Sequence, residues 1–230
     1  MQKKSITMND AELNSYFPVL LNLTDTRCLV IGGGEIAFHK VNSMLKFNAD
    51  ITILAPELNE KIEDLISKKK LKHIKGYYSS KYLRDYKIVI SATNNRSVNQ
   101  KVRGDCERRG ILLNVVDDPE LCDFILPANI QRGNLTISVA SQGKAPFYTR
   151  YFKSKLESLI SPVEGEILEL AAEYRKKVFS DPYFRKQDKK REAFKEFTAV
   201  NWDEVISENG IENAVGFIEE LLERIKNNNK

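Results

Sequence analysis

The first half of the chain alternates short apolar runs with longer stretches of helical patterning. Several runs are continuous rather than alternating with polar residues, as expected for parallel strands covered on both faces. This alternation predicts an α/β fold with an open parallel sheet. The apolar runs are Cys28–Ile31, Ile51–Leu54, Ile88–Ile90 and Ile111–Val116, with a weaker one at Leu71–Ile74, and the expected helices are Glu35–Phe47, Glu57–Lys70 and Arg96–Arg109.

Three glycines follow the first apolar run, in the stretch LVIGGGEIAFHK. The spacing Gly32-x-Gly34-x-x-Ala37 matches the dinucleotide fingerprint, in which the first glycine makes a turn and the second lets backbone approach a pyrophosphate. The small third residue lets helix and strand pack closely, and amides at the helix start meet the phosphate charge. The strand before and the amphipathic helix after the glycines are the context that this motif requires. We therefore predict a Rossmann-like sheet that binds a dinucleotide, against the alternative of a purely structural turn.

One part of the fingerprint is missing, because the second strand does not end in an acidic residue that could hold the ribose hydroxyls. Ala55 and Pro56 follow the strand, and Glu57 is the first acid. Glu57 could reach a ribose or could cap the next helix, and the sequence leaves both readings open. Because that loop has no Lys or Arg to hold a 2′-phosphate, NAD is preferred over NADP.

Two further strand ends carry polar residues where a dinucleotide would lie. The first, Ser91–Asn95, includes Thr93; it could face the crevice, cap the next helix, or do both. The second ends in Asp117 and Asp118 before a proline. Asp117 could take a proton or touch a metal there, whereas turn chemistry explains Asp118.

Beyond Asp117 the patterning changes to a hairpin around Arg132-Gly133, followed by helices. The loop from Ser141 to Pro146, with Lys144, is either an anion site or a plain helix entry. Lys and Arg outnumber acids from Lys144 to Lys195 and the reverse holds afterwards, which indicates an anionic partner or helix faces that pair with each other. The expected strands are Phe124–Gln131 and Asn134–Ser141, and the expected helices are Pro146–Ile160, Pro162–Phe179, Lys189–Val200 and Glu212–Lys226.

Composition excludes several classes. A net charge of +4 is too mild for a protein that coats nucleic acid. No apolar run approaches a membrane span and the N-terminus lacks the apolar core of a signal peptide, so we expect a cytoplasmic protein without a membrane partner.

The cysteines show neither zinc nor disulfide spacing, so we expect buried or incidental thiols. We expect His39 on an exposed helix face and His73 in a strand, neither as a metal ligand.

Taken together, the motifs resemble one family, the precorrin-2 dehydrogenase/sirohydrochlorin ferrochelatase proteins of siroheme synthesis. The same module forms the N-terminal half of multifunctional siroheme synthases. The resemblance covers about residues 15–180, in the family's order, and is far more specific than the glycine motif alone. The matching segments are Tyr16-Phe17-Pro18-Val19, VIGGGEIAFHK, ILAPEL, SATNN with Val98-Asn99, NVVDDPELCDFILPA and SVASQGKAPFYTRYFKSKLESLI.

The resemblance implies a homodimer that oxidises precorrin-2 to sirohydrochlorin with NAD and, in some members, inserts Fe²⁺ to give siroheme. It implies a Rossmann-like NAD-binding domain (1–116), a short β dimerisation segment (117–145) and a C-terminal helical domain (146–230). Because the tetrapyrrole substrate carries many carboxylates, the basic stretch after Lys144 is then read as a substrate-facing surface. The metal ligands are left unassigned.

By position, the resemblance gives Asp117 the catalytic role, in dehydrogenation and, where present, chelation. Two other functions stay open: a sirohydrochlorin chelatase without dehydrogenase activity, and a non-catalytic module that senses NAD or a tetrapyrrole. Binding of NAD, and the effect of Asp117→Ala on turnover, would separate them. The expected cofactor-binding residues are Gly32, Gly34, Glu35, Ile36, Ala37, Pro56, Glu57 and Thr93, and the expected substrate-binding residues are Ser141 and Lys144.

Overall fold

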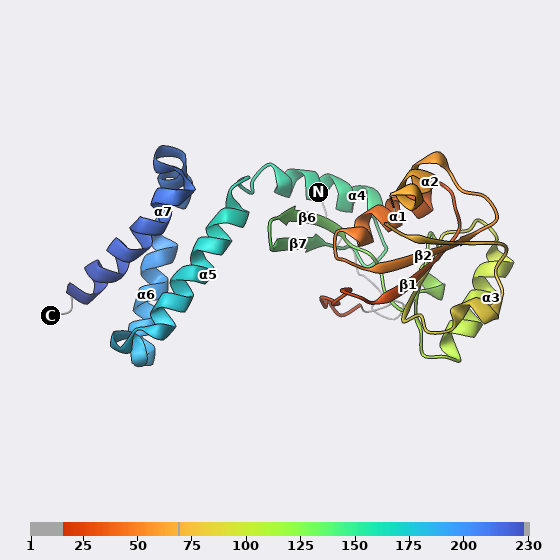
Figure 1. Ribbon diagram of the computed structural model, residues 1–230, viewed down its shortest axis with the longest axis horizontal. Helices are drawn as coiled ribbons and strands as arrows, with labels where there is room; N and C mark the ends of the chain where they lie inside the picture. Colours follow the sequence, from red (N-terminus) through yellow and green to blue (C-terminus); the bar gives the residue numbers. More distant parts are fainter. Residues whose placement is uncertain (1–15, 69, 228–230) are drawn as a thin grey trace, which may run out of the picture. The chain divides into compact units, whose positions relative to one another are not determined.

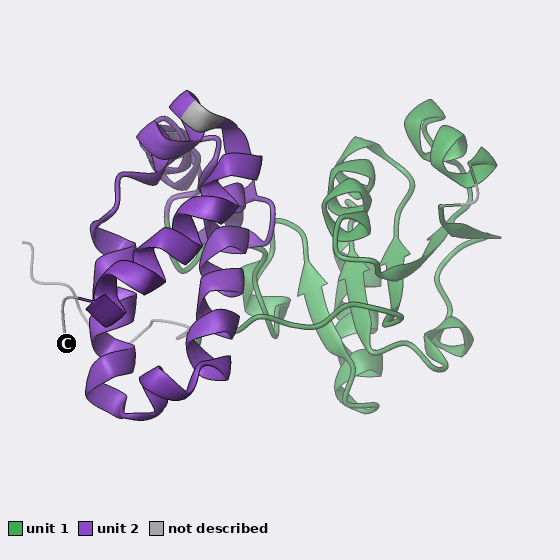
Figure 2. Ribbon diagram, turned by 60° about the vertical axis from the view of Figure 1, so that its left-hand side comes forward, with its two compact units in different colours: residues 1–126, 142–144 green, residues 127–141, 145–230 purple. Residues whose placement is uncertain are grey.

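The structure is a computed structural model that describes residues 16–68 and 70–227. The N-terminal segment in which we expect no signal peptide therefore lies almost wholly outside the described residues. The chain forms two compact units, shown in different colours in Figure 2. Unit 1 runs to Leu126 and takes in Gln142–Lys144, and unit 2 comprises Pro127–Ser141 and the chain from Ala145 onward. The expected division of the chain into NAD-binding, dimerisation and helical parts, with boundaries at residues 116 and 145, stays a prediction.

Unit 1 is built on a five-stranded parallel sheet with the order β3-β2-β1-β4-β5. Strands β1 and β2 of this sheet are labelled in Figure 1. Every apolar run of the first half forms one of these strands, which confirms the predicted Rossmann-like α/β class. Strands β1, β2 and β4 are buried along almost their whole length, as their continuous apolar sequences require. The bounds are β1 Arg27–Ile31, β2 Asp50–Ala55, β3 Lys72–Lys75, β4 Ile88–Ser91 and β5 Leu112–Val115.

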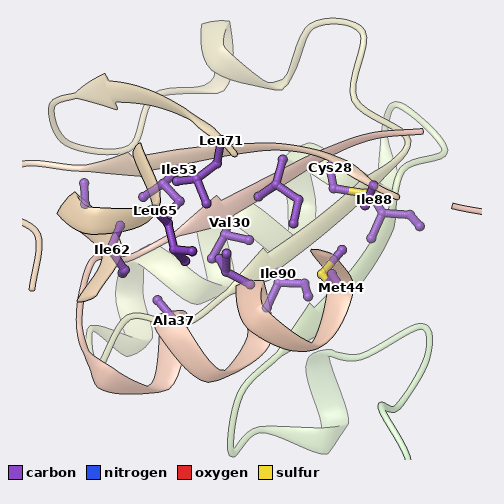
Figure 3. Packing of buried hydrophobic residues seen from close by; sticks show 14 residues of the cluster. Cys28, Val30, Ala37, Met44, Ile53, Ile62, Leu65, Leu71, Ile88 and Ile90 are labelled. Carbon is purple, nitrogen blue, oxygen red and sulfur yellow. The ribbon is translucent and has the colours of Figure 1, made fainter. Parts of the chain in front are cut away.

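Helices cover both faces of this sheet because successive strand residues point to opposite sides. Helices α1 (Glu35–Leu45) and α2 (Glu60–Ser67) share a buried cluster with Cys28 and Val30 of β1, seen close up in Figure 3. The intervening residue Leu29 joins a second cluster with helix α3 (Arg96–Glu107). Two 3₁₀ helices, η2 (Ser80–Leu83) and η3 (Pro119–Leu121), complete the described elements of unit 1.

Unit 2 begins with an antiparallel hairpin at the predicted turn, and helices follow. The first strand of the hairpin starts at Ala128 instead of the predicted Phe124. The turn uses Gly133 with a positive φ of 52° and packs on Gly165 of the first long helix, where a methyl group would lie 2.7 Å from the carbonyl carbon of Arg132. A separate core of aromatic and aliphatic side chains, Tyr174 and Trp202 among them, joins the later helices. The elements are β6 Ala128–Arg132, β7 Leu135–Val139, α4 Pro146–Glu157, α5 Glu164–Ser180, η4 Pro182–Arg185, α6 Gln187–Ala199 and α7 Trp202–Asn227.

Four helices begin elsewhere than the sequence predicts: α5 and α6 each start two residues from the predicted position, at Glu164 and Gln187, and the starts of α2 and α7 differ by more. Helix α2 starts at Glu60 instead of Glu57, because the side chain of Asn59 accepts the Ile62 amide and caps the helix. Asn59 thus takes the capping role that the sequence left open for Glu57. Helix α7 starts at Trp202, well before Glu212, and contains a kink at Gly210 (φ 72°, ψ 164°).

The structure also bears on the expectations about charge, thiols and membrane-spanning segments. Lys177 of the basic stretch pairs with Glu219 at 2.9 Å, which realises the pairing of helix faces at this position. The three cysteines are free, and Cys28 and Cys106 are buried, as expected. Within residues 16–68 and 70–227, no helix has the length and apolar character that crossing a membrane requires.

Candidate ligand cleft at the switch point of the sheet

The strand order reverses between β1 and β4, and the loops that follow these two strands lie at one edge of the sheet. In open α/β sheets, ligands bind in the crevice outside the strand ends at this point. The glycine loop follows β1, and Ala92–Asn94 follows β4. The sequence motifs that we singled out therefore occupy the position where this fold binds ligands.

Each of the three glycines has a different surrounding. A methyl group on Gly32 would lie 2.4 Å from the Ala92 carbonyl oxygen, and Gly32 has a φ of 120° that L side chains rarely adopt. A methyl group on Gly33 would lie 2.0 Å from the carbonyl oxygen of Glu57. At Gly34 it would meet nothing within 4 Å. The first two glycines thus let backbone segments pack together, and the third leaves open space.

The open space at Gly34 lies at the start of helix α1, where Gly34 is the N-cap residue and supplies no capping side chain. The first amides of an α-helix have no partner within the helix, so they are available to an anion. Ala37 is fully buried against β1, as the close packing of this motif requires. The residues present therefore fit the pyrophosphate of a dinucleotide.

A cleft of about 710 Å³ opens at this edge of unit 1. It brings together Ile36 of α1, Thr93 after β4 and Asp117 after β5, three of the residues that the sequence selected. Ile36 is 42% exposed at this cleft. The other lining residues are Ala92, Asn94, Arg96, Asn99, Val116, Asp118, Pro119 and Glu120.

Asp117 is exposed and has a left-handed backbone conformation, with φ at 61°. Asp and Asn tolerate this region better than other L residues, and such outliers gather at functional sites. The turn is supported by Cys122, whose sulfur lies 3.1 Å from the amide of Val115 and 3.3 Å from the carbonyl oxygen of Asp118. Burial raises the pKa of the Cys122 thiol, so it stays protonated.

Asp118 differs from Asp117 because its side chain has a partner. Its carboxylate lies 3.6 Å from the guanidinium of Arg96, and the side chain makes no capping hydrogen bond to η3. An ion pair, rather than turn chemistry alone, therefore accounts for Asp118. Arg96 itself is mostly exposed at the cleft.

The loop after β4 is held by Asn99, which is buried and reaches back from α3. Its amide nitrogen donates to the Thr93 carbonyl oxygen at 3.1 Å, and its amide oxygen accepts the Ser91 hydroxyl at 2.8 Å. Asn95 caps α3 by accepting the amides of Ser97 and Val98. The predicted double role of this segment is realised, since it caps a helix and also lines the cleft.

At the other side of the glycine loop, Glu35 contacts the segment that follows β2. Its carboxylate accepts hydrogen bonds from Lys61 Nζ at 2.6 Å and from Asn59 Nδ2 at 3.1 Å, and it lies 3.3 Å from His39 Nε2. The hydrogen bond from Lys61 lowers the pKa of Glu35 from its ordinary value, so the carboxylate stays ionised. Pro56 is half-buried and Glu57 is exposed in the same segment, outside the lining of the cleft.

The predicted substrate residues lie in a loop shared between the units. Lys144 is exposed in unit 1, where the Gln142 side chain hydrogen-bonds the backbone of Tyr16. Ser141 belongs to unit 2, and its hydroxyl oxygen accepts the Ala145 amide at 3.1 Å at the start of α4. These contacts are those of a helix entry, and the substrate roles stay predictions.

The histidines lie where the sequence places them. His39 is exposed on α1, and His73 is in β3 with its ring nitrogen 3.0 Å from the Ala55 carbonyl oxygen. No group of three or more His, Cys, Asp or Glu residues within the described ranges is arranged to hold a metal ion.

Four contributors were not singled out from the sequence as cofactor or substrate residues. Gly33 is buried in a backbone contact, and Arg96, Asn99 and Lys61 sit on helices whose facing loops only the fold reveals. The sequence did carry a signal for the stretch from Asn95 to Asn99, because Val98-Asn99 belongs to the segments that match the family. Lys61 carried no such signal, because strand β2 separates it in the sequence from its partner Glu35.

Comparisons with known proteins agree with this geometry. A family model described as "Putative NAD(P)-binding" matches residues 19–128. The siroheme synthase of Psychrobacter sp. (strain PRwf-1) is 39% identical over 164 residues, which cover 71% of this chain and 34% of that protein. The siroheme synthase of Chromobacterium violaceum is 39% identical over 160 residues, covering 70% and 34%. The chain thus spans about a third of the length of the curated relatives it matches.

A solved structure described as SirC, precorrin-2 dehydrogenase, has the same fold. It superposes with a TM-score of 0.68 at 23% sequence identity, over 92% of this chain and 100% of that one. The strand order, the glycine loop and the cleft define a Rossmann-like α/β protein with a ligand site at the switch point. Within that class, the chain is similar in sequence to the siroheme synthases over about a third of their length, and it shares its fold with the structure described as SirC, precorrin-2 dehydrogenase.

Proposed function

We propose that the chain oxidises precorrin-2 to sirohydrochlorin with NAD. The observation that carries this proposal is the exposed Asp117 carboxylate in the cleft at the switch point, beside the residues that would hold a dinucleotide. The names of the relatives, siroheme synthase and precorrin-2 dehydrogenase, support the choice of substrate and reaction.

The cofactor would be held by the glycine loop and the strand ends beside it. Gly34 gives the pyrophosphate room, and the amides of Glu35, Ile36 and Ala37 face its charge at the helix start. Gly32 and Gly33 fix the loop against Ala92 and Glu57. Ile36 and Thr93 would line the path of the dinucleotide into the cleft, and Pro56 and Glu57 would bound it after β2.

When bound, NAD supplies the oxidant by accepting a hydride. The oxidation also releases a proton, which needs a base in the cleft. Asp117 provides a carboxylate for this, and its exposed position lets it reach a bulky substrate. Cys122 supports the backbone of the turn that carries Asp117, through its contacts with Val115 and Asp118.

The substrate is a polycarboxylate, so cations near the cleft would orient it. Arg96 lies at the cleft and is paired with Asp118 only at 3.6 Å, so a substrate carboxylate could share its guanidinium. Lys144 is proposed as a second contact in unit 1, and Ser141 keeps its proposed substrate role in unit 2.

We further propose that the protein works as a homodimer in the cytoplasm. The free state of all three cysteines supports a reducing compartment. The dimer rests on the family resemblance, and light scattering during size-exclusion chromatography tests it: a mass of one chain would overturn it.

The test of function supplies purified protein with precorrin-2 and NAD and follows sirohydrochlorin and NADH. We expect both to form, and we expect Asp117→Asn to lower kcat by at least about 100-fold while NAD binding stays intact. Asparagine tolerates the same backbone conformation, so the turn is kept. Asp85→Asn is the matched control, since Asp85 has a φ of 68° but lies before β4, away from the strand ends of the cleft.

Each alternative has its own outcome. Metallation of sirohydrochlorin by Fe²⁺ without NADH formation would mean a chelatase alone. Binding of NAD without turnover of either kind would mean a sensing module. Full activity in Asp117→Asn would remove Asp117 from the mechanism.

A further inference from the structure

The corner between the glycine loop and the segment after β2 holds an ionic cluster that the proposed reaction does not use. Its centre is Glu35, whose carboxylate contacts Lys61, Asn59 and His39. The Glu35 side chain remains 51% exposed, so one part of the carboxylate is accessible to a ligand. The cluster therefore combines an ionised acid with two basic groups at the surface of unit 1.

The position of this cluster is fixed by backbone contacts. The Asn59 amide donates to the Gly33 carbonyl oxygen at 2.8 Å, and the Glu57 carbonyl oxygen packs on Gly33. The glycine loop and the β2–α2 segment are thus joined directly. In this fold the ribose of the adenosine half lies against the end of β2, where an acid normally binds its 2′-hydroxyl. Here β2 ends in Ala55 and Pro56 follows, so that acid is missing.

We infer that Glu35 replaces the missing acid and makes the site select NAD over NADP. This inference rests on the proposed dinucleotide site. The Glu35 carboxylate would accept a hydrogen bond from the ribose 2′-hydroxyl and repel a 2′-phosphate. It also compensates Lys61 and His39, which would otherwise attract that phosphate.

The alternative acid is Glu57, which lies in the β2–α2 segment itself and is exposed. It offers a matched control, because the same Glu-to-Gln change can be made at both positions. The two assignments differ in one measurable quantity, the ratio of the dissociation constants for NADP and NAD.

The experiment measures binding of NAD and of NADP by calorimetry at constant ionic strength, without substrate. We expect Glu35→Gln to lower the NADP-to-NAD ratio about tenfold or more, because a hydrogen bond to a charged group is lost and a repulsion is removed. Glu35→Arg should lower it further. Lys61→Gln, added to Glu35→Gln, should cancel most of the gained NADP affinity. Glu57→Gln should leave the ratio within about threefold.

Several results would overturn the inference. A ratio unchanged in both Glu35 variants, with NAD still bound, would do so, as would an equal loss of both cofactors. A shift in Glu57→Gln alone would assign the role to Glu57. If the unaltered protein binds neither cofactor, the proposed function itself fails, and this outcome is distinct from the others.

Discussion

At the glycine loop, a methyl group added to each of two neighbouring residues meets opposite environments. At Gly33 it would lie 2.0 Å from a backbone oxygen of the next loop, and at Gly34 it would meet nothing. Gly33 is therefore required by the packing of the protein itself, whereas Gly34 is required only by a ligand. One residue along the chain separates a structural role from a binding role.

This contrast gives a prediction for a matched pair of variants. Gly33→Ala should lower the free energy of unfolding by about 2 kcal/mol or more, because the backbone of Glu57 must shift. Gly34→Ala should cost less than about 1 kcal/mol, since its backbone is extended and its surroundings are open. Gly34→Ala should nevertheless weaken NAD binding about tenfold or more, by blocking close approach of the pyrophosphate. Urea unfolding and calorimetric titration measure the two effects, and a stable Gly33→Ala protein would contradict the packing argument.

The sequence could assign Gly32 and Gly34 because the fingerprint names them, but it was silent on Gly33. The contact of Gly33 is made by a loop more than twenty residues away, and no local pattern records it. The same holds for Glu35, since Lys61 approaches it only when α2 packs beside α1. Strand ends, by contrast, meet at one edge of a parallel sheet, so Thr93 and Asp117 could be predicted to lie near one crevice.

At the scale of elements, helix boundaries were harder to predict than strands. Strands β1, β2 and β4 contain continuous apolar runs, as a buried parallel sheet requires, so the sequence pattern locates them. Helix α7 is predicted only from Glu212, whereas the structure begins it at Trp202. The chain bends at Gly210, with φ 72° and ψ 164°, but residues from Trp202 onward are already helical.

The bend predicts opposite effects for two glycines of α7. Gly210→Ala should lower the free energy of unfolding by about 1–3 kcal/mol, because this combination of φ and ψ is almost restricted to glycine. Gly216→Ala should raise it by about 0.5–1 kcal/mol, because Gly216 is helical and a methyl group there meets nothing within 4 Å. Thermal unfolding followed by circular dichroism compares them. A stabilised Gly210→Ala protein would mean that the helix is straight in solution.

At the scale of the whole molecule, burial of weak acids ties stability to alkaline pH. Burial raises the pKa of Cys28 to about 11 and that of Cys106 to about 12, from an ordinary value of 9.0. The two thiols lie in the clusters on opposite faces of the sheet in unit 1. Tyr174 in the core of unit 2 is raised in the same way, to about 12.

The direction in which pH changes the free energy of unfolding follows from the difference between the folded and unfolded pKa values. These groups stay neutral in the folded protein but ionise at lower pH in the unfolded chain, so their contribution is intact below about pH 9 and is lost as pH rises through the folded values. We expect the free energy of unfolding, measured with urea, to fall between about pH 9 and 12. A protein with Cys28→Ala and Cys106→Ala should be less stable at neutral pH and show a shallower fall. An equally steep fall would assign the effect to other groups.

The backbone contacts of the glycine loop also order the events by which unit 1 is assembled. Cys28 of β1 pairs with Ile88 of β4, and such distant pairings form late because chain closure must precede them. Gly32 rests on Ala92 after β4, and Gly33 on Glu57 after β2, so the loop takes its final shape only once both strands have docked on β1. We therefore expect a ligand of this loop to bind chains that have finished folding, and not to act as a template for the nascent sheet.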